Sequence, residues 1–278
     1  MAAGAADGVN TLASYLNSDV DLNIPVSKVK QEKTFAVIIA NENYQEEVNV
    51  EFALNDGMAF REYCVKLLGI PESNLHVRKD ATLNNMLAEI NWMQNIAKAY
   101  GAEARFIFYY AGHGMPDESN GTSYLLPVDG KSNILATGYS MSRLYAELNG
   151  LNAACVTVLM DACFSGSKRG EGMLASARGV ALKAKAEAPK GNMLVMTAAQ
   201  GSETAYPYKE KKHGLFTYFL LKKLQESKGK VTYGDLFDYV KTNVAQKSVV
   251  VNEKSQTPTI AVSGDLVSTW QGIRLNED

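Results

Sequence analysis

The chain has 278 residues, of which 46% are apolar, and its 28 Lys and Arg residues nearly balance 30 Asp and Glu residues. A chain of this size and apolar content can bury a large core, so the composition excludes a protein that is disordered throughout. The net charge of −2 excludes the strongly basic field that recruits nucleic acid or an anionic membrane surface.

Residues 1–33 are weakly periodic, and we interpret them as an N-terminal extension that packs loosely or is removed as a propeptide. Their start, MAAGAAD, lacks the charged and apolar regions of a signal peptide. The sequence is therefore compatible with a cytoplasmic protein or with an exported protein that has lost its signal peptide. No apolar run reaches the roughly 20 residues of a membrane span. With no repeat or change of composition, residues 34–278 are expected to form one soluble domain.

From residue 34 onward, short apolar runs alternate with segments of helical periodicity. This alternation predicts a parallel sheet with right-handed crossovers and helices on both faces. The fold class is therefore α/β, with three layers and a mostly parallel sheet of about six strands. Strands are expected at 34–40, 75–77, 105–111, 156–161, 192–197 and 258–262, with a small hairpin arm at 124–129. Helices are expected at 53–68, 80–99, 142–148, 214–225 and 233–247. Ser142 is expected to cap the helix 142–148, and Thr232 the helix 233–247.

Two of the predicted strands end in residues that carry chemistry. The strand 105–111 runs into the glycine turn Gly112-His113-Gly114, and the strand 156–161 is followed by Cys163. Because the carboxyl ends of parallel strands open on one edge of a sheet, we expect the imidazole and the thiol to lie together. The imidazole would take the thiol proton, and the thiolate would attack a carbonyl. Taken singly, a turn histidine and a buried structural cysteine are the competing interpretations.

The three cysteines are odd in number and widely spaced, which favours neither a disulfide framework nor a structural zinc site. Cys64 lies in the apolar stripe of the helix 53–68 and Cys155 at the start of a strand, so both are assigned to core packing. An oxyanion needs two oriented donors, and the backbone N–H groups of Cys163 and Gly114 are expected to supply them.

Carboxylates near the same edge indicate the substrate. Asp161 lies two residues before Cys163, and Ala111 two before His113, so each pair points to one face of its strand. A carboxylate beside a small neighbour selects a cationic side chain. Asp56, at the start of the helix 53–68, adds a second carboxylate. The competing interpretations are a helix N-cap for Asp56 and a turn-forming residue for Asp161.

The run Tyr109-Tyr110-Ala111-Gly112-His113-Gly114, followed by Asp161-Ala162-Cys163-Phe164-Ser165-Gly166, resembles the caspase-like fold of clan CD cysteine peptidases. The resemblance covers residues 34 to about 262 and is closer to metacaspases and their bacterial relatives than to caspases. Caspases carry Gln where this chain has Asp161. That exchange is found in metacaspases and implies cleavage after Arg or Lys.

The resemblance implies a role for each matching residue. Cys163 would be the nucleophile and His113 the general base, and Asp56, Asp161 and Ala111 would form the pocket for the residue before the scissile bond. The loop that begins at Thr197 and Ala198 and runs to Tyr206 would line other subsites, with Tyr206 as an aromatic wall or as ordinary loop packing.

Relatives are often cut between a large-subunit part and a small-subunit part. The matching parts here are 34–165 and 192–278, joined by a linker at 166–191 that is rich in Lys and Arg. The linker is either a self-cleavage site for a basic-specific enzyme or a solvated basic loop. The candidate self-cleavage residues are Arg178, Lys183 and Lys185.

Many metacaspases use calcium through an acidic cluster after the His motif. This chain has only Asp117, Glu118 and Asp129 there, whereas calcium takes about six to eight oxygen ligands. We therefore predict no required cofactor and no metal ligands, with at most a weak calcium site completed by carbonyls and water. The expected partners are peptide or protein substrates with Arg or Lys before the scissile bond, with no nucleic acid and no membrane. A monomer is expected rather than a dimer.

Three other assignments compete with this one. Gly130-Lys131-Ser132 is similar to the end of a nucleotide-binding P-loop, but Leu125 stands where the first glycine belongs. Clostripain-like, gingipain-like and legumain-like peptidases share the His-Gly and Cys strand ends and are the second assignment. A non-catalytic caspase-like scaffold would normally lose the Cys or the His, and both are present.

Overall fold

The computed structural model describes residues 18–117, 121–164, 189–201 and 203–276. Within these ranges, none of the helices is both long enough and apolar enough to cross a bilayer. The strands are β1 (Thr34–Ala40), β2 (Leu75–Lys79), β3 (Arg105–Pro116), β4 (Ser123–Leu125), β5 (Tyr139–Ser140), β6 (Cys155–Cys163), β7 (Met193–Thr197), β8 (Pro207–Tyr208), β9 (His213–Gly214) and β10 (Thr259–Val262). The helices are α2 (Ala53–Glu62), α3 (Leu83–Tyr100), α4 (Met141–Asn149), α5 (Leu215–Ser227) and α6 (Tyr233–Asn252), with a short 3-10 turn η1 (Asp19–Asp21) before β1.

The central sheet has the strand order β10-β7-β6-β3-β1-β2. Its neighbouring strands pair in parallel, apart from β10, which is antiparallel to β7. The small strands β4 and β5 extend it beside the end of β3, and β8 and β9 form a separate hairpin. This architecture confirms the predicted α/β fold with a mostly parallel sheet.

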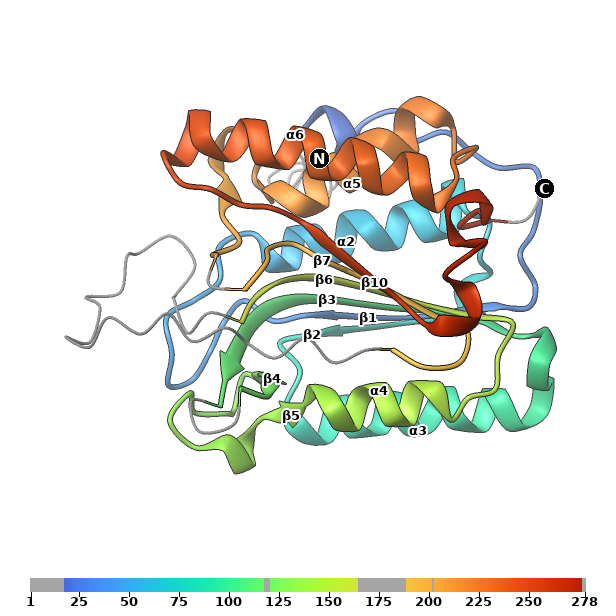
Figure 1. Cartoon of the computed structure of the whole chain (residues 1–278), viewed down its shortest axis with the longest axis horizontal. Helices are drawn as coiled ribbons and strands as arrows, with labels where there is room; N and C mark the ends of the chain where they lie inside the picture. The colour runs from blue at the N-terminus through green and yellow to red at the C-terminus, as the bar shows by residue number, and fades with distance from the viewer. Residues whose placement is uncertain (1–17, 118–120, 165–188, 202, 277–278) are drawn as a thin grey trace, which may run out of the picture.

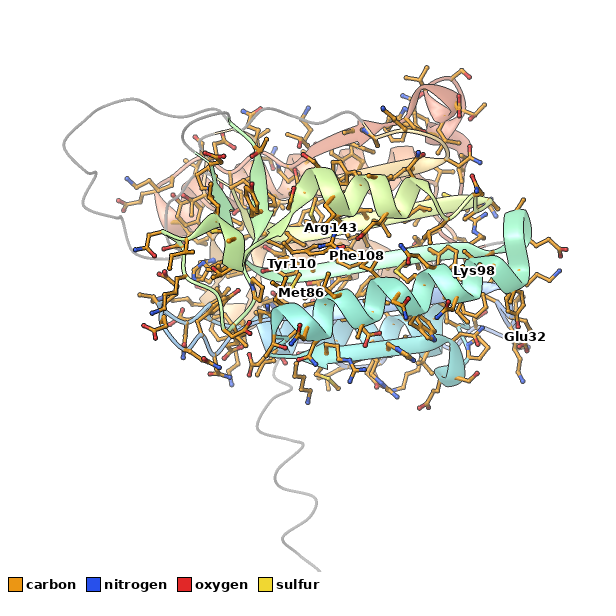
Figure 2. The ribbon with its side chains drawn as sticks, turned by 90° about the horizontal axis from the view of Figure 1, so that it is seen from below. Glu32, Met86, Lys98, Phe108, Tyr110 and Arg143 are labelled. Atoms are coloured by element: carbon orange, nitrogen blue, oxygen red, sulfur yellow. The ribbon has the colours of Figure 1, made fainter. Side chains whose placement is uncertain are left out.

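The helices cover the sheet on both sides, with α2, α5 and α6 on one face and α3 and α4 on the other (Figure 1). Alternation along each strand creates two separate apolar cores. Leu159 and Cys163 of β6 belong to the core under α2, α5 and α6, whereas Met160 belongs to the core against α3 and α4. In the second core, Met86 of α3 packs with Phe108 and Tyr110 of β3 (Figure 2).

The two chemistry-bearing strands are longer than the sequence predicts. β3 does not stop at the expected glycine turn but continues through His113 to Pro116, because β4 pairs with it from Gly114 onward. β6 likewise includes Cys163 itself. Both residues are therefore held by strand pairing, which fixes their position more firmly than a turn does.

The structure corrects one predicted helix cap and confirms the other. Ser140, not Ser142, begins α4, since its hydroxyl accepts the backbone N–H of Arg143 at 3.4 Å. The helix starts one residue earlier than expected, and this places Ser142 inside it. Thr232 caps α6 as predicted by accepting the N–H of Asp235 at 3.2 Å.

Candidate active site

His113 and Cys163 are direct partners in the parallel pairing of β3 with β6. Laterally paired residues of parallel strands project to the same face of the sheet, so the imidazole and the thiol leave the sheet side by side. Both side chains are buried, with residue exposures of 7% and 4%. The strand ends thus bring together the two residues that the sequence singled out.

Two tyrosines hold the backbone of His113. Its N–H donates to the hydroxyl of Tyr44 at 2.7 Å, and its carbonyl accepts from the hydroxyl of Tyr110 at 2.7 Å. The ring of Tyr44 also packs on the imidazole, with 4.7 Å between ring centroids. Burial raises the pKa of both tyrosines far above its ordinary value, so their hydroxyls stay neutral. The backbone N–H and carbonyl of His113, the candidate base, are therefore both held by tyrosine hydroxyls.

The imidazole of His113 is oriented by a backbone carbonyl. Its Nε2 lies 2.7 Å from the carbonyl oxygen of Val48. A carbonyl oxygen only accepts hydrogen bonds, so Nε2 must carry a proton. In the neutral ring this leaves Nδ1 unprotonated and able to take a proton from a thiol.

The thiol of Cys163 is contacted by the backbone of Ala205. The N–H of Ala205 donates to Sγ at 2.7 Å, and Sγ lies 3.5 Å from the carbonyl oxygen of the same residue. The N–H favours the thiolate, the reactive form, whereas the carbonyl oxygen can accept the S–H of the thiol form. Burial instead raises the pKa of the Cys64 thiol far above its ordinary value and keeps it protonated. Of these two thiols, Cys163 is the one on the strand end that pairs with His113.

Gly114 lies directly against Cys163, the candidate nucleophile. A Cβ atom at this position would come within 2.5 Å of the carbonyl oxygen of Cys163 and within 2.5 Å of Cδ1 of Phe164. Real Cβ atoms do not approach backbone so closely, so the close approach of β3 to the end of β6 requires glycine here.

We expect Gly114→Ala to lower kcat/KM for peptide hydrolysis about 100-fold, because a displacement of about 1 Å at reacting groups has that effect. Overpacking should also reduce the free energy of unfolding by about 1 to 3 kcal/mol. Steady-state kinetics and urea unfolding measure the two effects. Gly264→Ala is the matched control, since a Cβ there meets no atom within 4 Å. Equal activity in both variants would contradict the predicted crowding.

Asp161 is fully buried, at 0% exposure, and bonds to the first turn of α5. One of its carboxylate oxygens accepts the backbone N–H of Thr217 at 3.1 Å and the hydroxyl of Thr217 at 2.8 Å. The first N–H groups of a helix have no partner within the helix, and the helix dipole favours an anion beside them. Ala111, the partner of Asp161 in the β3–β6 register, is also buried.

Asp56 is fully buried at the same helix end. Both of its oxygens accept the N–H of Gly214, at 3.1 and 3.0 Å. Gly214 occupies the N-cap position of α5 and has no side chain with which to cap it. Asp56 from α2 and Asp161 from β6 therefore serve this helix end from outside, and the structure brings the two predicted pocket carboxylates together.

His213 links Asp56 to the N-terminal segment. Its Nδ1 lies 2.8 Å from Asp56 and its Nε2 lies 3.1 Å from Asp21. Since carboxylates only accept hydrogen bonds, both nitrogens carry protons and the ring is an imidazolium. Burial alone would lower the pKa of His213, but its hydrogen bonds with Asp21 and Asp56 outweigh this effect and raise that pKa to about 9.

This raised pKa predicts a loss of stability in alkaline solution. The stabilisation is fully present below pH 6.5 and is lost as the pH rises through about 9, because the folded protein then releases a proton. A difference of this size corresponds to roughly 3 kcal/mol. Urea unfolding of Cys163→Ala protein between pH 6.5 and 10 measures it. Adding His213→Gln should flatten this dependence, and an unchanged slope would contradict the assignment.

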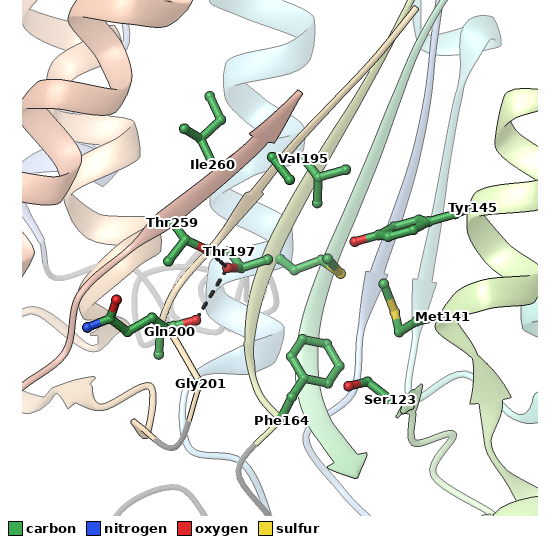
Figure 3. Close-up of a pocket in the computed structure, with 13 residues that line it drawn as sticks. Ser123, Met141, Tyr145, Phe164, Val195, Thr197, Gln200, Gly201, Thr259 and Ile260 are labelled. Atoms are coloured by element: carbon green, nitrogen blue, oxygen red, sulfur yellow. Dashed lines mark hydrogen bonds between the residues drawn. The ribbon is translucent and has the colours of Figure 1, made fainter. Parts of the chain in front are cut away.

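The other predicted substrate residues lie in two places. Thr197 lines a cavity of about 320 Å³ on the α4 side of the sheet, with Phe164 and Met160 (Figure 3). This side is opposite to Cys163, and the hydroxyl of Thr197 bonds there to Thr259. Ala198 is buried beneath the loop after β7, and Tyr206 is half-buried and directly follows Ala205.

The acidic residues considered for calcium do not gather in the described part of the chain. Asp129 accepts the N–H of Leu83 at the start of α3, and Asp117 is buried in a turn closed on Thr122. Among the described residues, no group of three or more His, Cys, Asp or Glu is arranged to hold a metal ion. Glu118 and the candidate self-cleavage residues Arg178, Lys183 and Lys185 lie outside the described residues.

Sequence reasoning missed four of these contributors. Tyr44 follows β1 at the same sheet edge as His113. The strand-end rule that predicted the positions of His113 and Cys163 therefore also applies to Tyr44. Val48 and Ala205 act through their backbone, which leaves no signal in residue type. The contact of His213 with Asp21 spans 192 residues and lies beyond any local pattern.

Comparison with known proteins agrees with this geometry. A family model described as the caspase domain, peptidase family C14, matches residues 33–265. The structure is similar to that of a protein from Geobacter sulfurreducens, with 18% identity, a TM-score of 0.63, and coverage of 87% of this chain and 98% of the other. It is also similar to caspase-1 from Spodoptera frugiperda, with 15% identity, a TM-score of 0.59, and coverage of 90% and 94%. These structural likenesses bear on the fold alone.

No curated protein sequence matches the chain significantly. The family match extends over most of the chain, starts one residue before β1 and ends beyond β10. The chain therefore belongs to the caspase domain family of clan CD cysteine peptidases.

Proposed function

We propose that the protein is a cysteine endopeptidase that uses Cys163 and His113 and cleaves peptide bonds after Arg or Lys. The observation that carries this proposal is the lateral pairing of His113 with Cys163 at the carboxyl ends of β3 and β6. The backbone N–H that donates to Sγ and the carbonyl that orients the imidazole support it, because each favours the reactive form of its partner.

In the proposed reaction, Nδ1 of His113 takes the proton of the Cys163 thiol, and the thiolate attacks the carbonyl carbon before the scissile bond. The N–H groups of Gly114 and Cys163 stabilise the oxyanion. The intermediate collapses, His113 protonates the departing amine, and an acyl-enzyme thioester remains. Water, deprotonated by His113, attacks the thioester and releases the acid and the thiol.

The preference for a basic residue rests on the two carboxylates at the start of α5. Asp161 lies two residues before the nucleophile on the same strand face, and Asp56 reaches the same helix end from α2. A guanidinium or ammonium group that replaced part of their hydrogen bonding would be matched in charge. Ala111 beside Asp161 leaves room for a long side chain. Substrates are then peptides and proteins with Arg or Lys at this position.

Hydrolysis of a panel of fluorogenic peptides tests the proposal. The panel varies one residue, the one before the reporter, among Arg, Lys, Asp and Asn, with Cys163→Ala protein as the blank. We expect cleavage after Arg and Lys. Cleavage after Asp alone would contradict the pocket assignment, and cleavage after Asn would favour a legumain-like site. No cleavage of any peptide would favour a non-catalytic scaffold.

Self-processing is a further part of the proposal. The linker 166–191 carries basic residues on both sides of its centre, including Arg178, Lys183 and Lys185. Intact-mass measurement of wild-type and Cys163→Ala samples after incubation identifies any cut. Fragments that appear equally in both samples would assign the cleavage to a contaminating protease.

A further inference from the structure

The short turn η1 is built into the fold. Val20 is fully buried at 0% exposure, and its carbonyl accepts the hydroxyl of Tyr63 at 2.7 Å. The side chain of Gln225 in α5 donates to the carbonyls of Asp19 and Leu22, at 3.1 and 2.7 Å. Backbone contacts to both α5 and the helix that follows α2 therefore hold η1 in place.

The two acids of η1 have different partners. Asp19 bonds to the hydroxyl of Tyr218 and the ammonium group of Lys222 in α5, and to the ammonium group of Lys211, which precedes β9. Asp21 points inward, where its carboxylate bonds to His213. Only Asp21 thus joins the buried chain Asp21–His213–Asp56, in which the Asp21 and His213 side chains are both 0% exposed.

The charge of this buried chain depends on Asp21. The imidazolium of His213 contributes one positive charge, and Asp21 and Asp56 contribute one negative charge each. The group therefore carries a net charge of −1, as a lone Asp56 would. If Asp21 were neutral and His213 stayed protonated, the imidazolium would offset the charge of Asp56, and the start of α5 would have one negative charge less.

We propose that Asp21 is a specificity-determining residue, which acts through His213 to keep a second negative charge at Asp56 for binding a basic substrate side chain. This inference rests on the proposed cleavage after Arg or Lys. Residues 18–22 of the N-terminal extension then belong to the active enzyme. Asp21 is a positioning residue, since it contacts His213 and no part of the proposed substrate site.

Asp21→Asn tests this role, because the amide keeps the size and an accepting oxygen while it removes the charge. At pH 6.5 we expect KM for an Arg peptide to rise about tenfold, as estimated for the loss of one charge several ångströms away, with kcat nearly unchanged. Asp21→Glu restores the charge and should return KM to within about threefold of the wild type. If Asp21→Asn does not fold, Asp21→Ser provides a second neutral replacement.

Asp19→Asn is the matched control. It removes the same unit charge from the same turn, but its partners are the partly exposed Lys222 of α5 and Lys211, which precedes β9. We expect lower stability from this variant and an unchanged KM. A peptide with citrulline in place of Arg, used as a competitive inhibitor, should bind wild type and Asp21→Asn equally, because it has the shape of Arg without its charge.

The outcomes separate the inference from the function on which it rests. If the wild type does not cleave after basic residues, the proposed function fails and the inference fails with it. If the wild type does so, and Asp21→Asn leaves KM unchanged or raises it no more than Asp19→Asn does, only the role of Asp21 is overturned. A fall in kcat at constant KM would likewise overturn it, because it would indicate a disturbed dyad.

Discussion

Cys163→Ala should abolish peptide hydrolysis, with a fall in kcat of about 10⁵-fold or more, as found when the nucleophile of a protease is removed. The reason is chemical, since in the proposed mechanism the acyl intermediate forms on the sulfur of Cys163. The fold should persist, because the substitution deletes one buried sulfur and leaves the N–H of Ala205 without its acceptor, a change of about 1 to 3 kcal/mol. Fluorogenic kinetics and thermal unfolding measure both effects.

Cys155→Ala is the matched control for the nucleophile. Cys155 lies on the same strand, is buried to the same 4% exposure, and stands at the opposite end of β6. This variant should keep full activity. Loss of activity in Cys155→Ala with retained activity in Cys163→Ala would contradict the assignment of Cys163 as the nucleophile.

Asp161→Asn should lower kcat/KM for Arg and Lys peptides by about 10²- to 10³-fold, because one charge of a buried ion pair is worth about 3 to 5 kcal/mol. The amide keeps the size of the carboxylate and leaves the backbone unchanged. The loss should appear mainly in KM, since the dyad itself is not altered. Steady-state kinetics with Arg, Lys and citrulline peptides separates the charge effect from a general loss of activity.

Thr217→Val distinguishes substrate recognition from helix capping. It removes the hydroxyl that bonds to Asp161 but keeps the carboxylate charge and the backbone N–H of residue 217. We expect reduced stability and an unchanged preference for basic residues. If Asp161→Asn and Thr217→Val shift activity and stability in parallel, Asp161 serves only to cap α5.

The sheet and the lateral pairing of His113 with Cys163 were predictable because both follow from simple periodic rules. The run 34–40 is apolar throughout and forms β1 with the predicted bounds. The meeting of His113 and Cys163 needs no knowledge of side-chain packing, since it follows once both strands lie parallel and end at one edge. These features depend on composition and on chain direction, and a single sequence contains both.

The surroundings of the dyad depended on distant contacts and were not predictable. The continuation of β3 past His113 is caused by pairing with β4, which local glycine content does not reveal. Asp56 was expected as a pocket residue or as an N-cap of its own helix. The sequence did not reveal that it also accepts the N–H of Gly214 and bonds to the imidazolium of His213, which lie 157 or more residues away.

The residues of α5 are synthesised after β3 and β6, and this sets the order in which the parts of the candidate site appear. The strands β3 and β6 are both complete once Cys163 has been synthesised, whereas Thr217 of α5, which donates to Asp161, lies 56 residues beyond this acid along the chain. A growing chain therefore contains His113 and Cys163 before it contains the part of α5 that bonds to Asp56 and Asp161. On the proposed function, a product that ended before Gly214 would carry both candidate dyad residues without the groups that hold its two candidate specificity acids.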